Sequence, residues 1–283
     1  METALTLVVA GLSLPLLFVR RYLGYLVAGI AASLLFHLGL ALYSPGPPGG
    51  ISYSPSLPLP LWGTPLAILL LWGLVFSLTL AISQDTRLNP MGKGFWGGLF
   101  SLLMAMILLA GLRGMELILY WTPHDAQFFG VPYSLLGSYL LAGFGLCFLA
   151  AFTRNTGWGS RLWLPLGVVL GIPLGVGLMA VLFRGSESDL FPLGVITILA
   201  LASSLLPVHC LGEPHAGPQD LIWKLALALV GIGVVLEATA FALGKVDWQG
   251  MTAFLVSLFF YTLYFVRHNE RALFASSYRA SLR

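Results

Sequence analysis

Uninterrupted apolar runs of roughly 20 residues recur along this chain, and each ends at Pro, Gly or charged residues. A lipid bilayer accepts only structures that satisfy their own backbone hydrogen bonds, namely α-helices and closed β-barrels. The runs are much longer than barrel strands and do not alternate between polar and apolar residues. They therefore predict an all-α fold, a polytopic membrane helix bundle.

The composition agrees with this class. Of 283 residues, 58% are hydrophobic and 9% are charged, whereas soluble domains carry roughly 25% charged residues. The net charge of +3 comes from basic residues at the ends of apolar runs, which is typical of a membrane topology signal and not of nucleic-acid binding. Cys147 and Cys210 lie in different runs, so no disulfide or zinc framework is indicated. Arg20 and Arg21 follow the first run instead of preceding it, which favours a retained helix over a cleaved signal.

The apolar runs predict about nine transmembrane helices. Their expected ranges are Ala4–Val19, Tyr22–Tyr43, Trp62–Ile82, Phe95–Trp121, Tyr133–Phe152, Leu162–Phe183, Phe191–Leu211, Leu221–Leu243 and Met251–Val266. The segment Ser44–Pro60 is rich in Pro, Gly and Ser and is expected to be a loop. We interpret residues 1–283 as a single integral membrane domain, with a short basic C-terminal tail from about residue 267.

The distribution of Lys and Arg predicts the orientation. With nine spans and the N-terminus outside, the inside segments collect Arg20, Arg21, Arg87, Lys93, Arg154, Arg161, Arg267, Arg271, Arg279 and Arg283. The outside loops keep only Arg184 and Lys245. Because inside loops are enriched in basic residues, the pattern predicts an N-out, C-in topology.

Ionisable residues inside the predicted helices are the candidate functional residues, because charged groups in a bilayer are costly and usually functional. At 1.5 Å per residue, His37 and Glu237 lie about 22 and 24 Å from the inner ends of their helices. Arg113 and Glu116 lie about 27 and 31 Å from the inner end of theirs. All four are thus expected in the outer half, and the loop carrying Asp125 is expected at the outer rim.

Each of these residues has a structural and a functional interpretation. Arg113 and Glu116 are about one helical turn apart and can form a static ion pair, or the arginine can tune the acidity of the carboxyl group. Glu237 has no basic neighbour within its run, which predicts a neutral acid that either donates a proton or only bonds a neighbouring helix. His37 is a packed histidine or a catalytic one, and Asp125 either shapes the loop or orients water.

Several chemistries are absent from the sequence. It contains no Gly-rich phosphate loop, no H-E-x-x-H and no G-x-S-x-G. His209, Cys210, Glu213 and His215 do not have the spacing of a compact zinc site, so we predict no metal and no cofactor. The interior, poor in charge and centred on carboxyl groups, suits a very apolar substrate.

Two segments, Gly111–Trp121 and Phe128–Tyr139, resemble the carotenoid biosynthesis integral-membrane family, which includes carotenoid 1,2-hydratases. Glu116 takes the place of the family's acidic residue, and Phe129-Gly130-Val131-Pro132 matches its loop motif. Gly63-Thr64-Pro65 fits more loosely. Tyr120-Trp121 stands where the family has Asp-Pro, and Ser134–Ser138 replaces its Asn-Phe-x-Gly-Trp.

The resemblance implies hydration of a terminal isoprenoid double bond of an acyclic-end carotenoid, without a cofactor. Glu116 or Glu237 would be the acid, His37 or Asp125 would orient water, and Arg113 would set which carboxyl is protonated. The substrate contacts are expected at Tyr120, Trp121, Phe128, Phe129 and Pro132. The expected partners are a carotenoid or other long isoprenoid lipid and membrane lipids, in a bacterial or archaeal inner membrane.

Two other functions fit the same residues. A non-catalytic pigment-binding subunit of a membrane-protein complex needs the same apolar groove but no acid, and the departures from the family motif favour it. A small-solute or proton-coupled transporter also uses buried Glu and Arg. Inverted repeats would support the transporter, and none is visible in the sequence.

Overall fold

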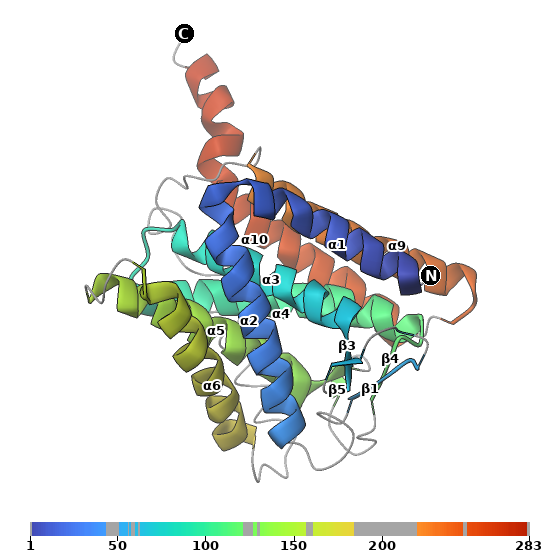
Figure 1. Cartoon of the computed structure of the whole chain (residues 1–283). Coiled ribbons are helices and arrows are strands. Elements are labelled where there is room, and N and C mark those ends of the chain that lie inside the picture. Colours follow the sequence, from blue (N-terminus) through green and yellow to red (C-terminus); the bar gives the residue numbers. More distant parts are fainter. Residues whose placement is uncertain are drawn as a thin grey trace.

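The computed structural model describes residues 2–43, 51–55, 57, 60–61, 63–120, 127–128, 131–156, 161–183, 220–245 and 248–281. Helices dominate these residues (Figure 1). They are α1 Glu2–Phe18, α2 Arg20–Tyr43, α3 Leu66–Gln84, α4 Pro90–Gly114, α5 Tyr133–Asn155, α6 Trp163–Phe183, α9 Leu221–Ala242 and α10 Trp248–Ser281. The predicted all-α class is therefore confirmed.

Five helices in the described residues are long and apolar enough to cross a membrane, which indicates a membrane protein. These candidate spans are Tyr22–Ala41, Leu66–Gln84, Pro90–Gly114, Ser134–Asn155 and Leu221–Ala242. The apolar stretches of α1 and α6 are shorter, and the predicted helix Phe191–Leu211 lies outside the described residues. The predicted count of about nine spans is not supported, because a hydrocarbon core about 30 Å thick needs roughly 20 apolar residues.

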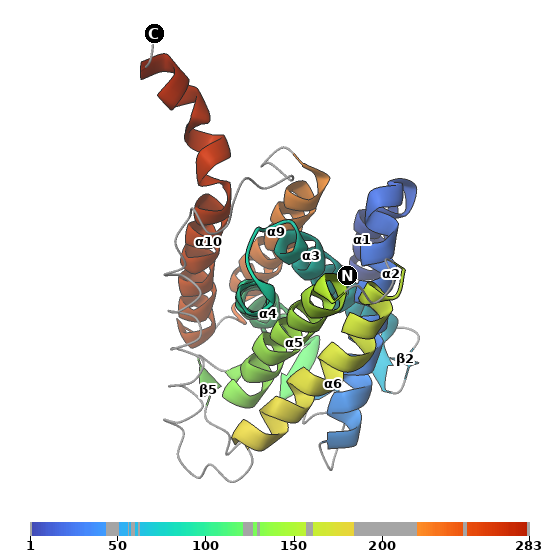
Figure 2. The ribbon, with the colours of Figure 1, turned by 90° about the vertical axis from the view of Figure 1, so that its left-hand side faces the viewer.

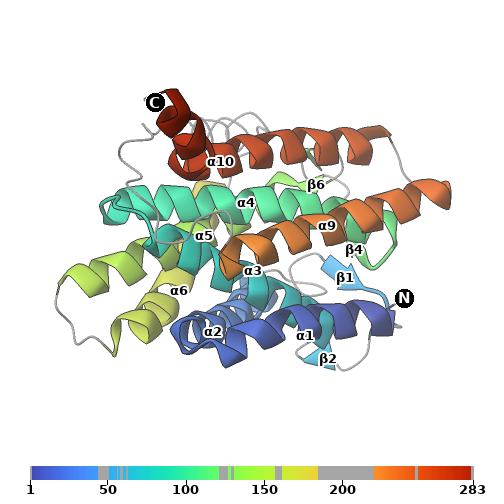
Figure 3. The same ribbon diagram turned by 90° about the horizontal axis from the view of Figure 1, so that it is seen from above.

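The helices α3 and α4 form the centre of the bundle. In the described residues, 89% of the apolar window of α3 and 94% of that of α4 are buried, whereas less than half of the apolar windows of α2 and α9 is covered. Figure 3 shows α9 and α10 running alongside α4. On the other side, α2 packs against α3 and α6, and α5 packs against α4 and α6. Ridges of small residues allow these close approaches, as is common in membrane helices.

Contacts at glycines establish the directions of the helices. A Cβ placed on Gly111 would lie 2.7 Å from the Cβ of Leu236, and one on Gly114 would lie 2.9 Å from that of Ala240, so α4 and α9 run in the same direction. A Cβ on Gly98 would lie 2.8 Å from the carbonyl oxygen of Leu140, and α5 runs opposite to α4. One end of the bundle thus gathers the C-terminal ends of α4 and α9 and the N-terminal end of α5.

This end is covered by short antiparallel strand pairs, and we name it the capped end. Strand β1 (Ile51–Tyr53) pairs with β4 (Ile118–Tyr120). Strand β2 (Pro60–Leu61) pairs with β3 (Thr64–Pro65), and β5 (Gln127–Phe128) pairs with β6 (Val131–Pro132). Figure 1 shows the strands together beside the ends of α3 and α4. The predicted helix Phe95–Trp121 was therefore too long, since α4 stops at Gly114 and the chain continues as a strand.

The helix α10 continues beyond the other helices. It runs without interruption to Ser281, and its last turns project away from the bundle (Figures 1 and 2). His268 and Asn269 are buried, so the start of the predicted basic tail is packed against the bundle and is helical in its described part.

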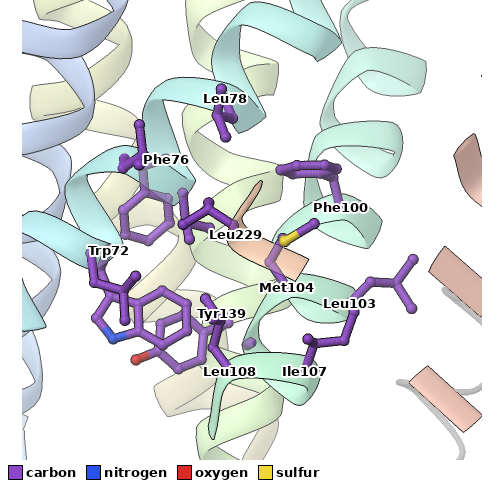
Figure 4. Packing of buried hydrophobic residues seen from close by; sticks show 14 of the residues in the cluster. Trp72, Phe76, Leu78, Phe100, Leu103, Met104, Ile107, Leu108, Tyr139 and Leu229 are labelled. Atoms are coloured by element: carbon purple, nitrogen blue, oxygen red, sulfur yellow. The ribbon is translucent and has the colours of Figure 1, made fainter. Parts of the chain in front are cut away.

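Aromatic rings fill the core between α2, α3 and α5. Trp72 stacks on Tyr139 with ring centroids 4.1 Å apart, and Phe36 lies 4.7 Å from the same tyrosine ring. In Figure 4, Leu108 of α4 lies beside Tyr139, and Leu229 of α9 lies nearer to Phe76. Side chains of α2, α3, α4, α5 and α9 thus all contribute to this buried core.

Candidate functional site

The helices α4 and α9 end in the same way. In α4, Leu117 N–H donates to the carbonyl of Leu112, and Glu116 N–H donates to that of Arg113. In α9, the corresponding bonds join Lys245 to Ala240 and Gly244 to Phe241. Both patterns are Schellman caps, which place one residue in the left-handed conformation.

The left-handed residue differs between the two caps. It is Gly244 in α9, with φ of +66°, and Glu116 in α4, with φ of +57°. A residue with a Cβ pays roughly 1–2 kcal/mol for this conformation, and such strain often marks functional sites. The cap also explains why α4 ends early, and it removes Glu116 from the helical face that it was predicted to share with Arg113.

Glu116 forms an ion pair with Lys245 of the neighbouring cap. The Lys245 Nζ lies 2.8 Å from Glu116 Oε2, and the two side chains are 39% and 64% exposed. This carboxylate is solvated and neutralised, which does not fit a buried proton donor. Lys245, which follows the cap glycine of α9, had been assigned only to the end of its helix. Its pairing with Glu116 could not be inferred because it depends on α4 and α9 being neighbours.

Glu237, unlike Glu116, is buried in an apolar interface between helices. It is only 3% exposed and lies on the face of α9 that packs against α4. Its Oε2 would lie 4.0 Å from a Cβ placed on Gly114, and its backbone nitrogen would lie 3.5 Å from one on Gly111. The carboxyl group is therefore at the level of the last turn of α4, which also carries the half-buried Arg113. This agrees with the similar depths predicted from the helical rise.

The capping strands bring the sequence motifs to this end. Thr64 and Pro65 of β3, together with Val131 and Pro132 of β6, are buried at the start of α3 and α5. Tyr53 of β1 forms a side-chain hydrogen bond with Thr64, and burial raises the pKa of its hydroxyl group well above the ordinary value. A neutral hydroxyl is thus held beneath the cap.

His37 occupies a different place. Its Nδ1 lies 2.8 Å from the carbonyl oxygen of Ser33, which can only accept, so Nδ1 carries the proton and Nε2 presents a lone pair. Nε2 is buried and has no hydrogen-bond partner among the described residues. The ring packs edge-on against Phe36, at 5.4 Å. Both contacts of His37 are with residues of its own helix, α2, and Phe36 belongs to the aromatic core. Glu237 instead packs against α4.

The remaining predicted residues are only partly visible. Asp125, Trp121 and Phe129 lie outside the described residues. Tyr120 and Phe128 belong to β4 and β5 by their backbone, and Pro132 is buried in β6. The structure thus places Arg113, Glu116 and Glu237 at one end and sets His37 apart from them.

A second polar cluster lies at the opposite end, where the sequence had pointed to no site. Trp96 of α4 donates its Nε1–H to Nδ1 of His268 at 2.9 Å, and Trp223 of α9 packs on the same imidazole at 5.0 Å. Burial lowers the pKa of His268 to about 3. The imidazole is therefore neutral at physiological pH and joins α4, α9 and α10.

No family model matches this chain, and neither curated proteins nor solved structures gave a match. Within the described part of the chain, no group of three or more His, Cys, Asp or Glu could hold a metal ion.

Proposed function

We propose that this protein is a membrane enzyme that adds water to a terminal isoprenoid double bond of a carotenoid, with Glu237 as the acid. One observation carries the proposal: a carboxyl group that is 3% exposed lies in the apolar interface between α4 and α9, at the end of the bundle that the strand pairs cover. An acid in such surroundings can protonate an apolar alkene that water alone leaves unreacted.

The segments that resemble the carotenoid hydratase family support this proposal by their position. They lie on the last turns of α4, on β4, on the β5–β6 pair and at the start of α5. The Gly63-Thr64-Pro65 segment lies on β3 and beside it. All of these elements meet at the capped end, where Glu237 is buried, although Glu237 itself is about 100 residues away in the sequence.

The chemistry needs few groups. The Glu237 carboxyl would transfer its proton to the less substituted alkene carbon, which leaves a tertiary carbocation and a carboxylate. Water would add to the cation, and the proton that it loses would restore the acid, so the reaction adds one water and consumes no cofactor. Arg113, at the same level of α4, would stabilise the carboxylate while the cation exists.

The roles of the other residues follow from their surroundings. Glu116 is solvated and paired with Lys245, so we assign it to the rim of the site and not to proton transfer. His37 lies apart from Glu237, which leaves Asp125 as the proposed group that orients water. We propose that Tyr120, Trp121, Phe128, Phe129 and Pro132 bind the polyene.

We also propose that the capped end faces outward and the opposite end faces the cytoplasm of a bacterial or archaeal cell, in an N-out, C-in arrangement. Among the described side chains, the opposite end gathers Arg20, Arg87, Lys93, Arg154, Arg161, Lys224 and Arg267. Among the described side chains, the capped end has Arg113 and Lys245, and it also carries the carboxyl groups of Glu116 and Glu237. The positive-inside rule favours this orientation. The apolar stretches outside the five candidate spans would complete a bundle of about nine.

The test is expression in a host that accumulates lycopene or γ-carotene, followed by chromatography and mass spectrometry of the pigments. The wild-type chain should yield a product heavier by one water. Glu237→Gln keeps the shape of the side chain but cannot donate the proton, so it should lower product formation by at least about 100-fold, the usual contribution of an acid–base group.

Glu116→Gln is the matched control, because it removes the other carboxyl group at the same end. It should retain most of the activity. No hydrated product from the wild type, or an active Glu237→Gln beside an inactive Glu116→Gln, would contradict the proposal. Both variants should be present in the membrane at the wild-type level.

A pigment-binding structural subunit is the second candidate. Phe259 and Phe260 of α10 are exposed, with their rings 5.7 Å apart, and offer an aromatic surface along which a polyene could lie. Carotenoid that copurifies unchanged with the wild-type protein, together with no hydrated product, would favour this function.

A further inference from the structure

Trp163 joins three helices at the end opposite the cap. It is the first residue of α6, and its ring lies 6.4 Å from that of Tyr25 in α2. The guanidinium carbon of Arg154, in the last turn of α5, lies 5.6 Å from the centre of the Trp163 ring. This distance is within the range of a cation–π interaction. The indole thus positions an exposed arginine at the edge of the apolar bundle.

Further cations surround this pair. Lys93 of α4 is half-buried and donates to the carbonyl oxygen of Gln84 at 3.2 Å. Its charge is close enough to that of Arg154 for the two to repel each other, and Asp85 offsets part of this repulsion. Arg161 is exposed only two residues before Trp163. Lys93 and Arg154 thus lie near each other beside Asp85, and Arg161 lies just before the start of α6, which Trp163 begins.

Apolar side chains flank the same cations. Phe152 precedes Arg154 by two residues, Leu162 follows Arg161, and both are exposed. Phe152 belongs to α5 and Leu162 directly precedes α6, and because both helices are apolar along their length, we expect these exposed surfaces to face lipid. A ligand here meets positive charge at the end of the helices and hydrocarbon beside it.

We propose that Lys93, Arg154, Arg161 and Trp163 form a binding site for the headgroup of an anionic phospholipid. The phosphate would relieve the repulsion between Lys93 and Arg154 and accept hydrogen bonds from the guanidinium groups. The acyl chains would lie against Phe152 and Leu162. Basic pockets at the membrane surface bind anionic headgroups in this way. The site is independent of the proposed hydratase activity, because it lies at the other end of the bundle.

A soluble anion fits the observations less well. It would use the three cations but would leave the apolar side chains beside them without a partner. An aromatic ring that positions an arginine at the membrane interface is typical of lipid contact. Because α4 and α5 are candidate membrane spans, we expect the site, which lies at their ends and at the start of α6, to be near the lipid phosphates.

The experiment is native mass spectrometry of the full-length protein released from nanodiscs that contain equal amounts of phosphatidylglycerol and phosphatidylcholine. The wild type should retain phosphatidylglycerol preferentially. The double variant Arg154→Gln with Arg161→Gln should retain roughly 30-fold less of it, since each of the two basic side chains contributes about 1 kcal/mol of attraction at the surface and about 1.4 kcal/mol is a factor of ten.

The control removes two exposed cations of the same end that are not part of the proposed site, one in α9 and one in the connection between α3 and α4, by Lys224→Gln with Arg87→Gln. This variant should retain phosphatidylglycerol like the wild type, and both variants should melt near the wild-type temperature in phosphatidylcholine. Equal loss in the two variants would mean a diffuse charge effect and would overturn the local site. Equal retention of both lipids by the wild type would overturn it as well. Competition by inorganic phosphate at millimolar concentration would assign the site to a free anion instead.

Discussion

The two caps at the ends of α4 and α9 allow a direct measurement of how much Glu116 lowers the free energy of unfolding. They share their hydrogen bonds, and they differ in the left-handed residue, which is Glu116 in one and Gly244 in the other. The perturbation is Glu116→Gly, which gives α4 the cap that α9 already has. If the cap were only structural, glycine would be the better residue at this position.

The magnitude follows from two opposing terms. Relief of the left-handed strain contributes roughly 1–2 kcal/mol in favour of the glycine variant. Loss of the Glu116–Lys245 ion pair costs at most about 1 kcal/mol, and less at the observed exposure of 39% and 64%. The variant should therefore be more stable than the wild type by roughly 1 kcal/mol, or about 2 °C in melting temperature for a chain of this size.

Thermal unfolding in detergent or nanodiscs is the assay, with two controls. Glu116→Ala removes the ion pair but keeps the strain, so it should not be stabilising. Gly244→Ala introduces the strain into the other cap, where a Cβ would meet no atom within 4 Å, and should cost roughly 1–2 kcal/mol.

A wild-type melting temperature for Gly244→Ala, or a less stable Glu116→Gly, would refute the reasoning. In that case the left-handed conformation would not be strained in this context, and it would give no reason to connect Glu116 with function. A Glu116→Gly variant that is more stable but forms less product would show instead that the strained conformation of Glu116 contributes to activity at the cost of stability.

Two further predictions concern the rest of the bundle. Burial lowers the pKa of His268 to about 3 in the folded state, so its contribution to the free energy of unfolding is fully present above about pH 6.5 and is lost as the pH falls towards 3, at roughly 1.4 kcal/mol per pH unit. Denaturation curves of His268→Gln should lack this part of the pH dependence. A pH dependence equal to that of the wild type would contradict the prediction. A Cβ on Gly171 would lie 2.5 Å from the carbonyl oxygen of Gly145, so Gly171→Ala should force α5 and α6 apart and cost roughly 1–3 kcal/mol. Gly231→Ala, which meets no atom within 4 Å, should be neutral or slightly stabilising in the same melting assay.

The apolar runs were sufficient to predict where helices form, but not where α4 ends. The residues after Gly114 are as apolar as those before it, so hydropathy gives no sign of a boundary. The left-handed residue of a helix cap is usually glycine, so Gly244 marks the end of α9 in the sequence. The glutamate at position 116 does not mark the end of α4 in this way. The strand pairing of Ile51–Tyr53 with Ile118–Tyr120 joins three-residue segments far apart in the chain, which periodicity cannot detect.

The depth of the candidate-site residues could be predicted from the sequence, but which of them lie next to one another could not. Helical rise alone placed Glu237 at the level of Arg113, because both helices start at the same end of the bundle. Which helices are neighbours depends on the glycines of α4 and α9, and these were visible only as general packing residues. The pairing of Glu116 with Lys245 and the separate position of His37 both follow from that arrangement.

The arrangement of charges at the capped end explains why the two carboxyl groups differ. Glu116 and Lys245 face each other because both caps extend past the buried helix ends, where water solvates the pair. Glu237 is one to two turns deeper, on the face where Gly111 and Gly114 allow α9 to approach α4. Arg113, in the last turn of α4, is the other described cation at this end, and it lies at the level of Glu237. The shallow pair neutralises the rim, so the electrostatic balance of the deeper carboxyl depends on the arginine and on the apolar interface. If the proposed hydratase activity is correct, this difference in burial favours Glu237 over Glu116 as the proton donor, although Glu116 is the carboxyl that lies within the family-like sequence.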